Sequence, residues 1–286
     1  MEGTGVDQHE FRAGQRRDWD EASKGWREWS EFIDRTTAPV SERLTAMARV
    51  GPGQRVLDVA AGYGEPSLTA AKIVGPEGEV VATDISAGML AYGRERAAAA
   101  GLQNLEFIES DAVSPEFPPG SFDAALSRWG IIFEPDGEGA ASRVRGFLKP
   151  GARLAISSWG PPERVPFIAM PMGTVIKQLE LPPPPPGRPG PLSRPTPAAI
   201  GALLEGGGFS DVEVDELEIT FEYDSAEEFT RSVQELVPPV VNLVKPHPPE
   251  VQERVWQAVT DAARGLASED GSLRLPNLVL VAAGRA

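Results

Sequence analysis

Two glycines that follow a short apolar segment are the first residues whose spacing indicates chemistry. Residues 54–64 read Gln-Arg-Val-Leu-Asp-Val-Ala-Ala-Gly-Tyr-Gly. Val56 to Val59 predicts a buried strand, Gly62 and Gly64 predict a tight turn, and a helical pattern follows. Glycine lets the backbone approach a ligand closely and take φ values that a side chain disfavours. A strand, a glycine turn and a helix in this order form a pocket for a nucleotide-like ligand at the carboxyl edge of an open α/β sheet.

The spacing inside this turn also restricts the choice of cofactor. A dinucleotide fingerprint has a third glycine three residues after the second. This sequence has Ser67 at that position, and Ala60 stands ahead of Gly62. The pattern therefore disfavours a nicotinamide or flavin cofactor. Asp58 is an ionisable group within the apolar strand, which is costly unless its side chain is hydrogen-bonded.

Two further acids follow expected strands. Asp84 ends the apolar segment 80–84, where it could accept hydrogen bonds from both ribose hydroxyls of an adenosyl ligand. The alternative role for Asp84 is a helix cap, but Ser86 is the better cap candidate. Asp111 comes just after the expected strand 105–109 and could accept from the amine of adenine. A solvated loop aspartate is the alternative there.

Five expected strands alternate with helical segments. They cover residues 56–59, 80–84, 105–109, 121–128 and 153–159. This alternation predicts an α/β protein with a doubly wound parallel sheet.

Composition excludes several classes of function. The 286 residues include 27 basic and 42 acidic residues, giving a net charge of −15 and a pI near 4.7. An acidic surface repels phosphate backbones, so we expect no nucleic acid partner. The absence of cysteine removes thiolate metal sites, and we expect no metal. Without a long apolar run or a signal peptide, we expect a cytoplasmic protein with no stable membrane insertion. The sequence leaves open whether the protein is a homodimer.

These segments together resemble a class I S-adenosylmethionine-dependent methyltransferase, similar to the ubiquinone and menaquinone biosynthesis branch. The likeness covers roughly residues 15–160. The segments that carry it are 56–64, 80–90, Glu-Ser-Asp-Ala at 109–112, Ser-Phe-Asp-Ala-Ala-Leu-Ser-Arg at 121–128 and 148–154. The resemblance implies a seven-stranded Rossmann-like sheet, S-adenosyl-L-methionine as cofactor and S-adenosyl-L-homocysteine as product.

The resemblance also implies where the cofactor lies. The turn would face its methionine part, strand ends would bind ribose and adenine, and an aromatic lid would cover it. In the turn, the resemblance implies Ala60, Gly62 and Gly64, with Asp58 ordering the turn. It implies Asp84 for the ribose, Ile85 and Met89 beside the adenine, and Asp111 and Ala112 on the edge of the adenine. The Ser127–Arg128 backbone would border the methyl group, and Trp19 or Trp26 would belong to the lid.

Two departures from the family pattern matter. The family commonly has glycine where this chain has Ala60, and alanine is expected to fit only with a negative φ. Residues 127–130 read Ser-Arg-Trp-Gly, in place of the Asn/Asp-Pro-Pro-Tyr of enzymes that methylate amines of nucleic acid or glutamine. This difference and the acidic charge both favour a small acceptor.

The rest of the chain is expected to cover this core. Residues 1–15 are expected to be mobile and to precede helices at 18–33 and 38–50, and the prolines 182–186 predict an extended linker. Further helices are expected at 167–181, 225–236 and 249–266, and strands at 209–223 and 275–283. The predicted units are an N-terminal helical lid (1–50), the cofactor-binding core (51–160), a proline-rich cap insertion (161–197), core (198–223), a helical cap insertion (224–271) and the last core strand (272–286).

The expected reaction is in-line methyl transfer to carbon or oxygen of a small, largely apolar molecule of quinone, polyketide or terpenoid type. A general base is needed only for a hydroxyl or an acidic carbon. The candidates for that base are His247, Glu134 and Asp136. The alternatives are an NAD(P)-dependent oxidoreductase and a non-methylating protein that keeps the cofactor fold.

Overall fold

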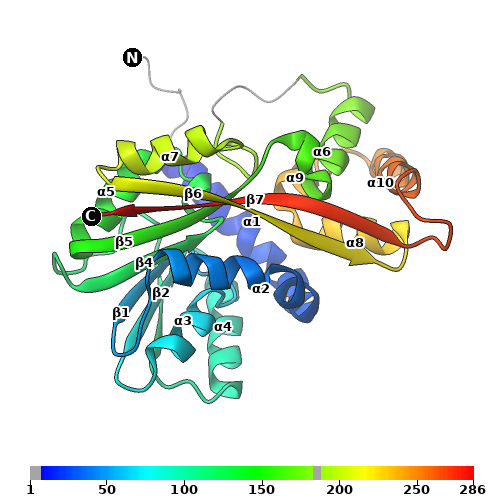
Figure 1. Ribbon diagram of the computed structural model, residues 1–286. Coiled ribbons are helices and arrows are strands. Elements are labelled where there is room, and N and C mark those ends of the chain that lie inside the picture. Colours follow the sequence, from blue (N-terminus) through cyan, green and yellow to red (C-terminus); the bar gives the residue numbers. More distant parts are fainter. Residues whose placement is uncertain (1–7, 183–187) are drawn as a thin grey trace.

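The computed structural model describes residues 8–182 and 188–286, which form one seven-stranded sheet between layers of helices (Figure 1). The strand order is β3-β2-β1-β4-β5-β7-β6, and only β7 runs antiparallel to its neighbours β5 and β6. The predicted doubly wound, seven-stranded sheet is confirmed. The strands are β1 (Arg55–Val59), β2 (Glu79–Asp84), β3 (Leu105–Glu109), β4 (Phe122–Arg128), β5 (Leu148–Trp159), β6 (Ser210–Tyr223) and β7 (Leu273–Arg285).

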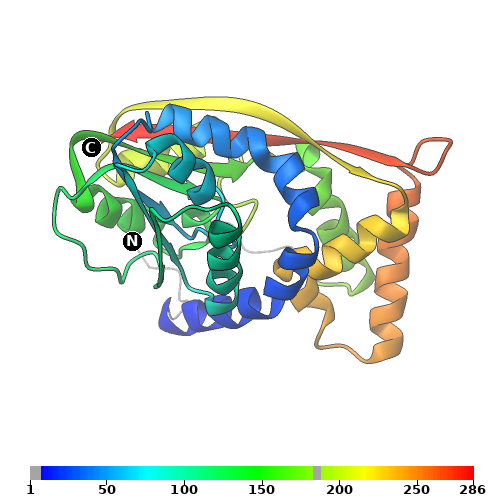
Figure 2. The same cartoon turned by 90° about the horizontal axis from the view of Figure 1, so that it is seen from below.

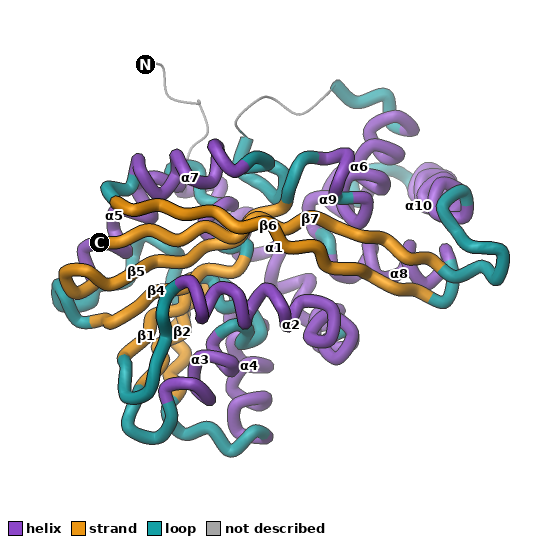
Figure 3. Tube along the Cα trace, in the orientation of Figure 1, coloured by secondary structure: helices purple, strands orange, loops and turns teal. Residues whose placement is uncertain are grey.

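The central strands are mainly apolar because helices cover both faces of the sheet. Successive side chains of a strand point to opposite faces, so Val56 of β1 joins one hydrophobic cluster and Leu57 joins the other. The helices α2 (Ser30–Met47), α3 (Ser67–Val74) and α4 (Ala87–Ala99) lie on one side, and α5 (Gly137–Phe147) and α7 (Pro197–Gly206) on the other (Figures 1 and 3).

The parallel register brings the carboxyl ends of three strands to one edge of the sheet. Asp58 of β1 is level with Ala82 of β2 and with Leu126 of β4. The direction of winding reverses between β1 and β4, and ligands bind at such a switch point in open α/β sheets. The fold therefore places the glycine turn, Asp84 and Arg128 together.

The last two strands extend well beyond the rest of the sheet. β7 pairs with β5 only over residues 279–285, whereas its pairing with β6 continues to Leu273. The protruding ribbon carries Phe221 and Tyr223, whose rings contact those of Phe167 and Phe229 in a separate group of helices at the right of Figure 1. These cap helices are α6 (Pro166–Gln178), α8 (Ala226–Leu236), α9 (Pro238–Val244) and α10 (Pro249–Arg264).

The N-terminal helices differ from the prediction. α1 spans Gln8–Glu28, and the chain bends at Trp29 before α2 continues through Pro39. The expectation of a mobile segment up to residue 15 is wrong for residues 8–15, because Phe11, Arg12 and Gln15 extend the inner face of α1 along a cavity. Residues 1–7 lie outside the described part of the chain.

α1 connects the core to the cap (Figure 2). A Cβ atom at Gly25 would lie 2.4 Å from the carbonyl oxygen of Glu235, so only glycine allows this approach of α1 to α8. Next to it, the indole N–H of Trp29 donates to the Glu235 carboxylate at 2.6 Å. The N-terminal helices and the second insertion therefore form one continuous wall.

Smaller differences concern element ends. β5 begins at Leu148, so the expected turn at 149–151 belongs to the strand, and α9 has no counterpart among the predicted elements. Residues 183–187 of the expected proline linker lie outside the described residues. Two short 3₁₀ helices follow β4 and β5, at Ile131–Phe133 and Pro162–Arg164. Among the described helices, none is both long and apolar enough to cross a membrane.

Phe229 tests the packing of the cap on the β6–β7 ribbon. Its side chain is fully buried, with the rings of Tyr223 and Phe167 at centroid distances of 5.4 and 6.4 Å. Phe229→Ala should lower the free energy of unfolding by about 3–5 kcal/mol in urea titrations followed by tryptophan fluorescence. The control Leu266→Ala removes a half-exposed side chain and should change it by less than about 0.5 kcal/mol. Equal effects of the two substitutions would contradict the described packing.

Candidate active site

A cavity opens at the carboxyl edge of the sheet, between the core, α1, α2 and the cap. Its empty volume is about 1350 Å³ when the part open to solvent is included. We call the part lined by Asp84 and Asp111, after β2 and β3, its acidic end, and the part lined by Trp129, Trp159, Phe167 and Phe221 its aromatic end. A large cleft that combines apolar walls with a few convergent polar groups is the usual form of a small-molecule site.

Asp84 joins two parts of the acidic end. One carboxylate oxygen accepts from the backbone N–H of Gly62 and the other from that of Ser86, both at 2.8 Å. A carboxylate oxygen can accept more than one hydrogen bond, so both oxygens can still accept from a pair of hydroxyls. Ser86 itself caps α4 by accepting from the N–H of Met89 at 3.1 Å, as predicted. Asp84 therefore does not cap the helix through its side chain.

Burial raises the pKa of Asp84 to about 6, although the N–H groups of Ser86 and Gly62 act to lower it. The Asp20 carboxylate, on α1, also raises this pKa. Asp20 accepts from the Ser86 hydroxyl at 2.6 Å and from the N–H of Gly88 at 3.2 Å. Two carboxylates therefore meet at the start of α4, and one of them belongs to the N-terminal helix.

Asp111 and Ala112 line the cavity beyond β3, and Ile85 and Met89, which follow β2, line it as well. One Asp111 oxygen accepts from the N–H groups of Val113 and Ser114, at 3.0 and 2.6 Å. Partial burial acts to raise the pKa of Asp111, but its hydrogen bonds to Ser114 and Val113 outweigh burial and lower it. Asp111 therefore stays ionised beside an apolar slot.

Ala60 has φ +57°, so the expectation of a negative φ there is wrong. The turn fixes this conformation, since the N–H of Ala61 donates to the carbonyl of Thr83 at 2.9 Å. A left-handed alanine costs about 1–2 kcal/mol. Its methyl group has space because residue 130 is glycine, where a Cβ would lie 2.4 Å from that of Ala60. Gly130, on the segment after β4, therefore makes room for the alanine that replaces the family's glycine at residue 60.

Three of the expected cofactor residues lie behind the cavity wall. Asp58 is fully buried and accepts from the hydroxyl of Ser67, while its second oxygen has no partner among the described groups. Burial raises the pKa of Asp58 to about 7. Gly64 continues the turn with φ +108°, and the Ser127 hydroxyl accepts from the N–H of Ile131 at 3.1 Å. Asp58, Gly64 and Ser127 support the lining residues without being among them.

α1 covers the acidic end as a lid. Trp19 and Trp26 both line the cavity, and the Trp19 ring contacts those of Trp26 and Phe133 at centroid distances of 6.2 and 5.6 Å. Arg12 donates to Glu134, after β4, at 3.0 Å, and Arg16 forms an ion pair with Glu109 at the end of β3. With Asp20 at the start of α4, the lid is bound to the ends of three strands.

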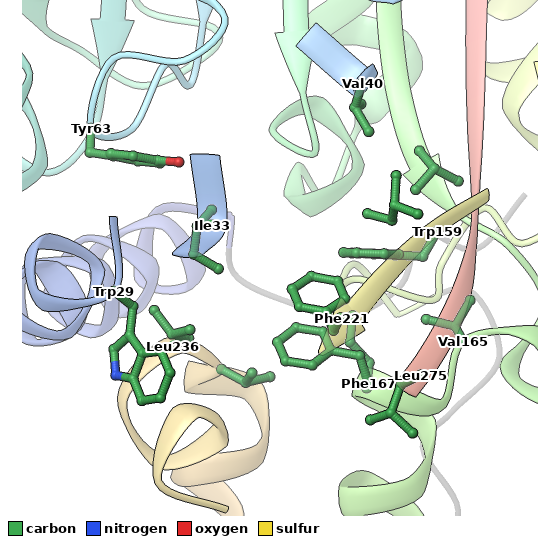
Figure 4. Packing of buried hydrophobic residues seen from close by; sticks show 14 of the residues in the cluster. Trp29, Ile33, Val40, Tyr63, Trp159, Val165, Phe167, Phe221, Leu236 and Leu275 are labelled. Carbon is green, nitrogen blue, oxygen red and sulfur yellow. The ribbon is translucent and has the colours of Figure 1, made fainter. Parts of the chain in front are cut away.

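The other end of the cavity has aromatic walls. Trp129 and Trp159 stack with centroids 4.5 Å apart and planes within 7°, and Phe167 and Phe221 stack at 4.2 Å and 4°. Figure 4 shows Trp159, Phe167 and Phe221 on one side and Tyr63 with Ile33 on the opposite side. The cap completes this end with Ile168, Leu236, Val237 and Pro239.

Trp129 is strained, with φ +55°, and its N–H donates to the Ser157 hydroxyl at 3.0 Å. Its indole N–H is buried and has no partner among the described groups. Bulky residues persist in the left-handed region only where their surroundings hold them there, which is frequent at active sites.

The three candidates for a general base occupy different places. Glu134 lines the cavity at the acidic end, where burial raises its pKa against the opposing charge of Arg12. Asp136 caps α5 by accepting from the N–H of Gly139 at 2.8 Å, and His247 follows α9; neither lines the cavity. The structure therefore brings only Glu134 to the cavity, and it does so in a lid ion pair.

Sequence reasoning missed most residues of the aromatic end and several residues of the lid. Tyr63 and Glu65 belong to the glycine turn itself, which was a usable signal. The other missed residues come from segments that meet only in the folded chain. They include Phe11, Arg12, Gln15, Ile33, Thr37, Trp129, Phe133, Trp159, Phe167, Ile168, Pro191, Phe221, Leu236, Val237 and Pro239.

Comparisons with known proteins show what the core of the chain is similar to. A model described as a methyltransferase domain matches residues 56–151. Aklanonic acid methyltransferase DauC of Streptomyces sp. (strain C5) is 36% identical over 139 residues, covering 46% of this chain and 63% of that protein. The ubiquinone/menaquinone biosynthesis C-methyltransferase UbiE of Ectopseudomonas mendocina is 38% identical over 117 residues, covering 41% and 46%. Residues 56–151 are therefore similar to the core of class I S-adenosylmethionine-dependent methyltransferases.

The likeness to this methyltransferase family is concentrated in the core. The matched segments span about half to two thirds of the length of these two relatives. A putative methyltransferase from Bacillus halodurans shares the fold over 86% of this chain and 97% of its own, with a TM-score of 0.57 and 19% identity. The cap has no support from the family model, which ends at residue 151.

The acidic end fits S-adenosylmethionine. Asp84 keeps acceptor capacity on both oxygens, Ile85 and Met89 provide an apolar slot, and Asp111 stays ionised at its edge. The turn at Gly62 brings backbone next to Asp84. These are the groups that an adenosine with a short charged chain requires.

The raised pKa of Asp84 predicts that cofactor binding depends on pH. The ionised carboxylate would accept from ribose hydroxyls, and with a pKa of about 6 Asp84 is mostly protonated at pH 5. S-adenosylhomocysteine should therefore bind about tenfold more weakly at pH 5 than at pH 7.5 in calorimetric titrations. Asp84→Asn should bind weakly at both pH values. A pH dependence that persists in Asp84→Asn would assign the titration to another group, such as Asp58.

Proposed function

We propose that the protein transfers the methyl group of S-adenosylmethionine to a carbon or oxygen atom of a small, largely apolar molecule with a flat ring system. The observation that carries this proposal is the division of one cavity into an acidic end and an aromatic end. Asp84 and Asp111 line the first, and Trp129 and Trp159 line the second. A cofactor at the acidic end would direct its reactive group towards the aromatic end.

The aromatic walls suit a planar acceptor. Parallel rings at the Trp129–Trp159 and Phe167–Phe221 pairs present flat faces to the cavity. Aromatic side chains favour offset stacking and edge contacts with other rings, in addition to the burial of apolar area. The indole N–H of Trp129 could donate to a carbonyl or phenolic oxygen of the acceptor.

In this proposal, the residues of the protein position the acceptor and exclude water. Bound S-adenosylmethionine supplies a methyl group that its sulfonium has already activated. The stacked rings would hold the acceptor atom in line with that methyl group, and α1 and the cap would keep solvent out.

The acceptor would bring its own ionised atom. Among the described residues, those that line the cavity include no histidine, and Glu134, the lining carboxylate that follows β4, forms an ion pair with Arg12. Burial raises the pKa of Tyr63, which keeps its phenol protonated. An acidic phenol, an enol or a carboxylic acid loses its proton to solvent before it binds and then needs no base. One relative is named for an acid and the other for quinone biosynthesis, which supports this class.

Two alternatives remain from the sequence. An NAD(P)-dependent oxidoreductase is disfavoured by Ser67 and by the methyltransferase family model. A non-methylating protein with the same fold differs only in turnover, so the test must measure product.

Methyl transfer is measured with deuterated-methyl S-adenosylmethionine and mass spectrometry, on a panel of hydroxylated and carboxylated polycyclic aromatics. We expect labelled product with at least one member and none with saturated analogues. Trp159→Ala should lower kcat/KM at least about tenfold through lost stacking, with unchanged binding of S-adenosylhomocysteine.

Trp256→Ala is the matched control, because this indole lies on α10 outside the cavity. It should leave kcat/KM within about twofold. Binding of S-adenosylhomocysteine without turnover of any acceptor would contradict methyl transfer to this class. Binding of NAD in its place would favour the oxidoreductase.

A further inference from the structure

Among the described residues, a buried cation at the end of β4 donates hydrogen bonds only to neutral groups. Arg128 is 7% exposed and lines the cavity. Its guanidinium donates to the hydroxyls of Thr37 at 2.8 Å and Ser41 at 3.2 Å, and more distantly to that of Tyr63 at 3.4 Å. Across residues 8–182 and 188–286, no carboxylate forms an ion pair with it.

Such an arrangement is costly unless an anion completes it. A buried charge needs a partner of opposite charge to offset its lost hydration. Burial acts to lower the pKa of Arg128, but interactions with Tyr63, Glu65 and Asp34 raise it overall, so the side chain stays charged. The three hydroxyls fix the direction of the guanidinium and leave its charge without a direct counterion.

Glu65 provides the opposite charge on the same wall. It belongs to the turn, lines the cavity, and accepts from the hydroxyl of Thr69 at 2.7 Å. Arg128 and Glu65 interact electrostatically without forming an ion pair. A separated cation and anion beside one cavity are complementary to a ligand that carries both charges.

Gly62 and Tyr63 of the turn connect the two charged groups to Asp84, where we expect the ribose. The N–H of Gly62 is bonded to Asp84, while the hydroxyl of the next residue, Tyr63, faces Arg128. A ligand with its sugar on Asp84 would cross the turn and bring a short side chain to Arg128 and Glu65.

We propose that Arg128 and Glu65 bind the amino-acid end of the cofactor, with the guanidinium on its carboxylate and Glu65 on its ammonium group. This rests on the proposed function. Guanidinium and carboxylate match in geometry and form strong charge-assisted hydrogen bonds. Thr37 and Ser41 give α2 a part in this subsite, because they hold the guanidinium in position.

An acceptor carboxylate offers the same chemistry as the cofactor's. The hydrogen bond of Arg128 to Tyr63 favours the cofactor, because Tyr63 follows Gly62, whose N–H donates to Asp84. The experiment separates the two sources.

Calorimetry with two ligands tests the role of Arg128. S-adenosylhomocysteine carries the amino-acid group, and 5′-methylthioadenosine has the same adenosine and sulfur without it. Arg128→Met should weaken the first at least about 30-fold and the second less than about threefold. Arg153→Met is the control, since it removes another buried guanidinium outside the cavity, and it should affect neither ligand.

Glu65 is tested with the deaminated analogue of S-adenosylhomocysteine. Glu65→Gln should weaken S-adenosylhomocysteine about tenfold and leave the analogue unchanged, because the analogue lacks the ammonium group. If Arg128→Met does not fold, the wild type is titrated with the methyl ester of S-adenosylhomocysteine, which should bind at least about tenfold more weakly than the acid.

Several results would overturn the inference. They are equal loss of both ligands in Arg128→Met, no loss of either, or full affinity of the wild type for the methyl ester. Unchanged S-adenosylhomocysteine binding with lost binding of anthraquinone-2-carboxylate would assign Arg128 to the acceptor. Failure of the wild type to bind both adenosyl ligands would instead refute the proposed function.

Discussion

The hydrogen bonds of Asp84 to two backbone N–H groups hold the site together. They connect the turn after β1, at Gly62, to the start of α4, at Ser86, across the ends of two parallel strands. The carboxylate is buried, and burial raises its pKa to about 6. Without a partner such a group would favour the neutral form even more strongly. Its two N–H donors keep an ionisable acceptor at the sheet edge, where a sugar can reach it.

The remaining elements are arranged around that edge. α1 is attached to it through Asp20, Arg16 and Arg12, each bound after a different strand. The β6–β7 ribbon extends past the sheet and supports the cap, which adds the aromatic end of the cavity. We therefore propose that the core binds the cofactor and that the cap helps to bind the acceptor. The family model likewise covers only the core.

The sequence predicted the core because its signals there are local. Val56 to Val59 and the two glycines specify strand and turn within a few residues. Asp84 could be predicted in the same way, because it is the last residue of the apolar segment that forms β2. The long ribbon and the meeting of Trp159, Phe167 and Phe221 could not be predicted, since each residue comes from a separate segment. Their contacts depend on how β6 and β7 pair beyond β5.

Ala60 shows a different limit of the sequence. Its positive φ contradicts the preference of alanine, and the space for its methyl group comes from Gly130, 70 positions later in the chain. The role of residues 8–15 was missed for a similar reason. Their polar composition is typical of a mobile terminus, but Arg12 meets Glu134 only once β4 and the segment after it have folded.

A crystal structure of the complex with S-adenosylhomocysteine tests the central claim most directly. We expect the ribose hydroxyls within hydrogen-bond distance of both Asp84 oxygens, the adenine between Ile85 and Asp111, and the sulfur directed towards Trp129 and Trp159. A ligand bound with its adenine among the aromatic rings, or outside this cavity, would contradict the account.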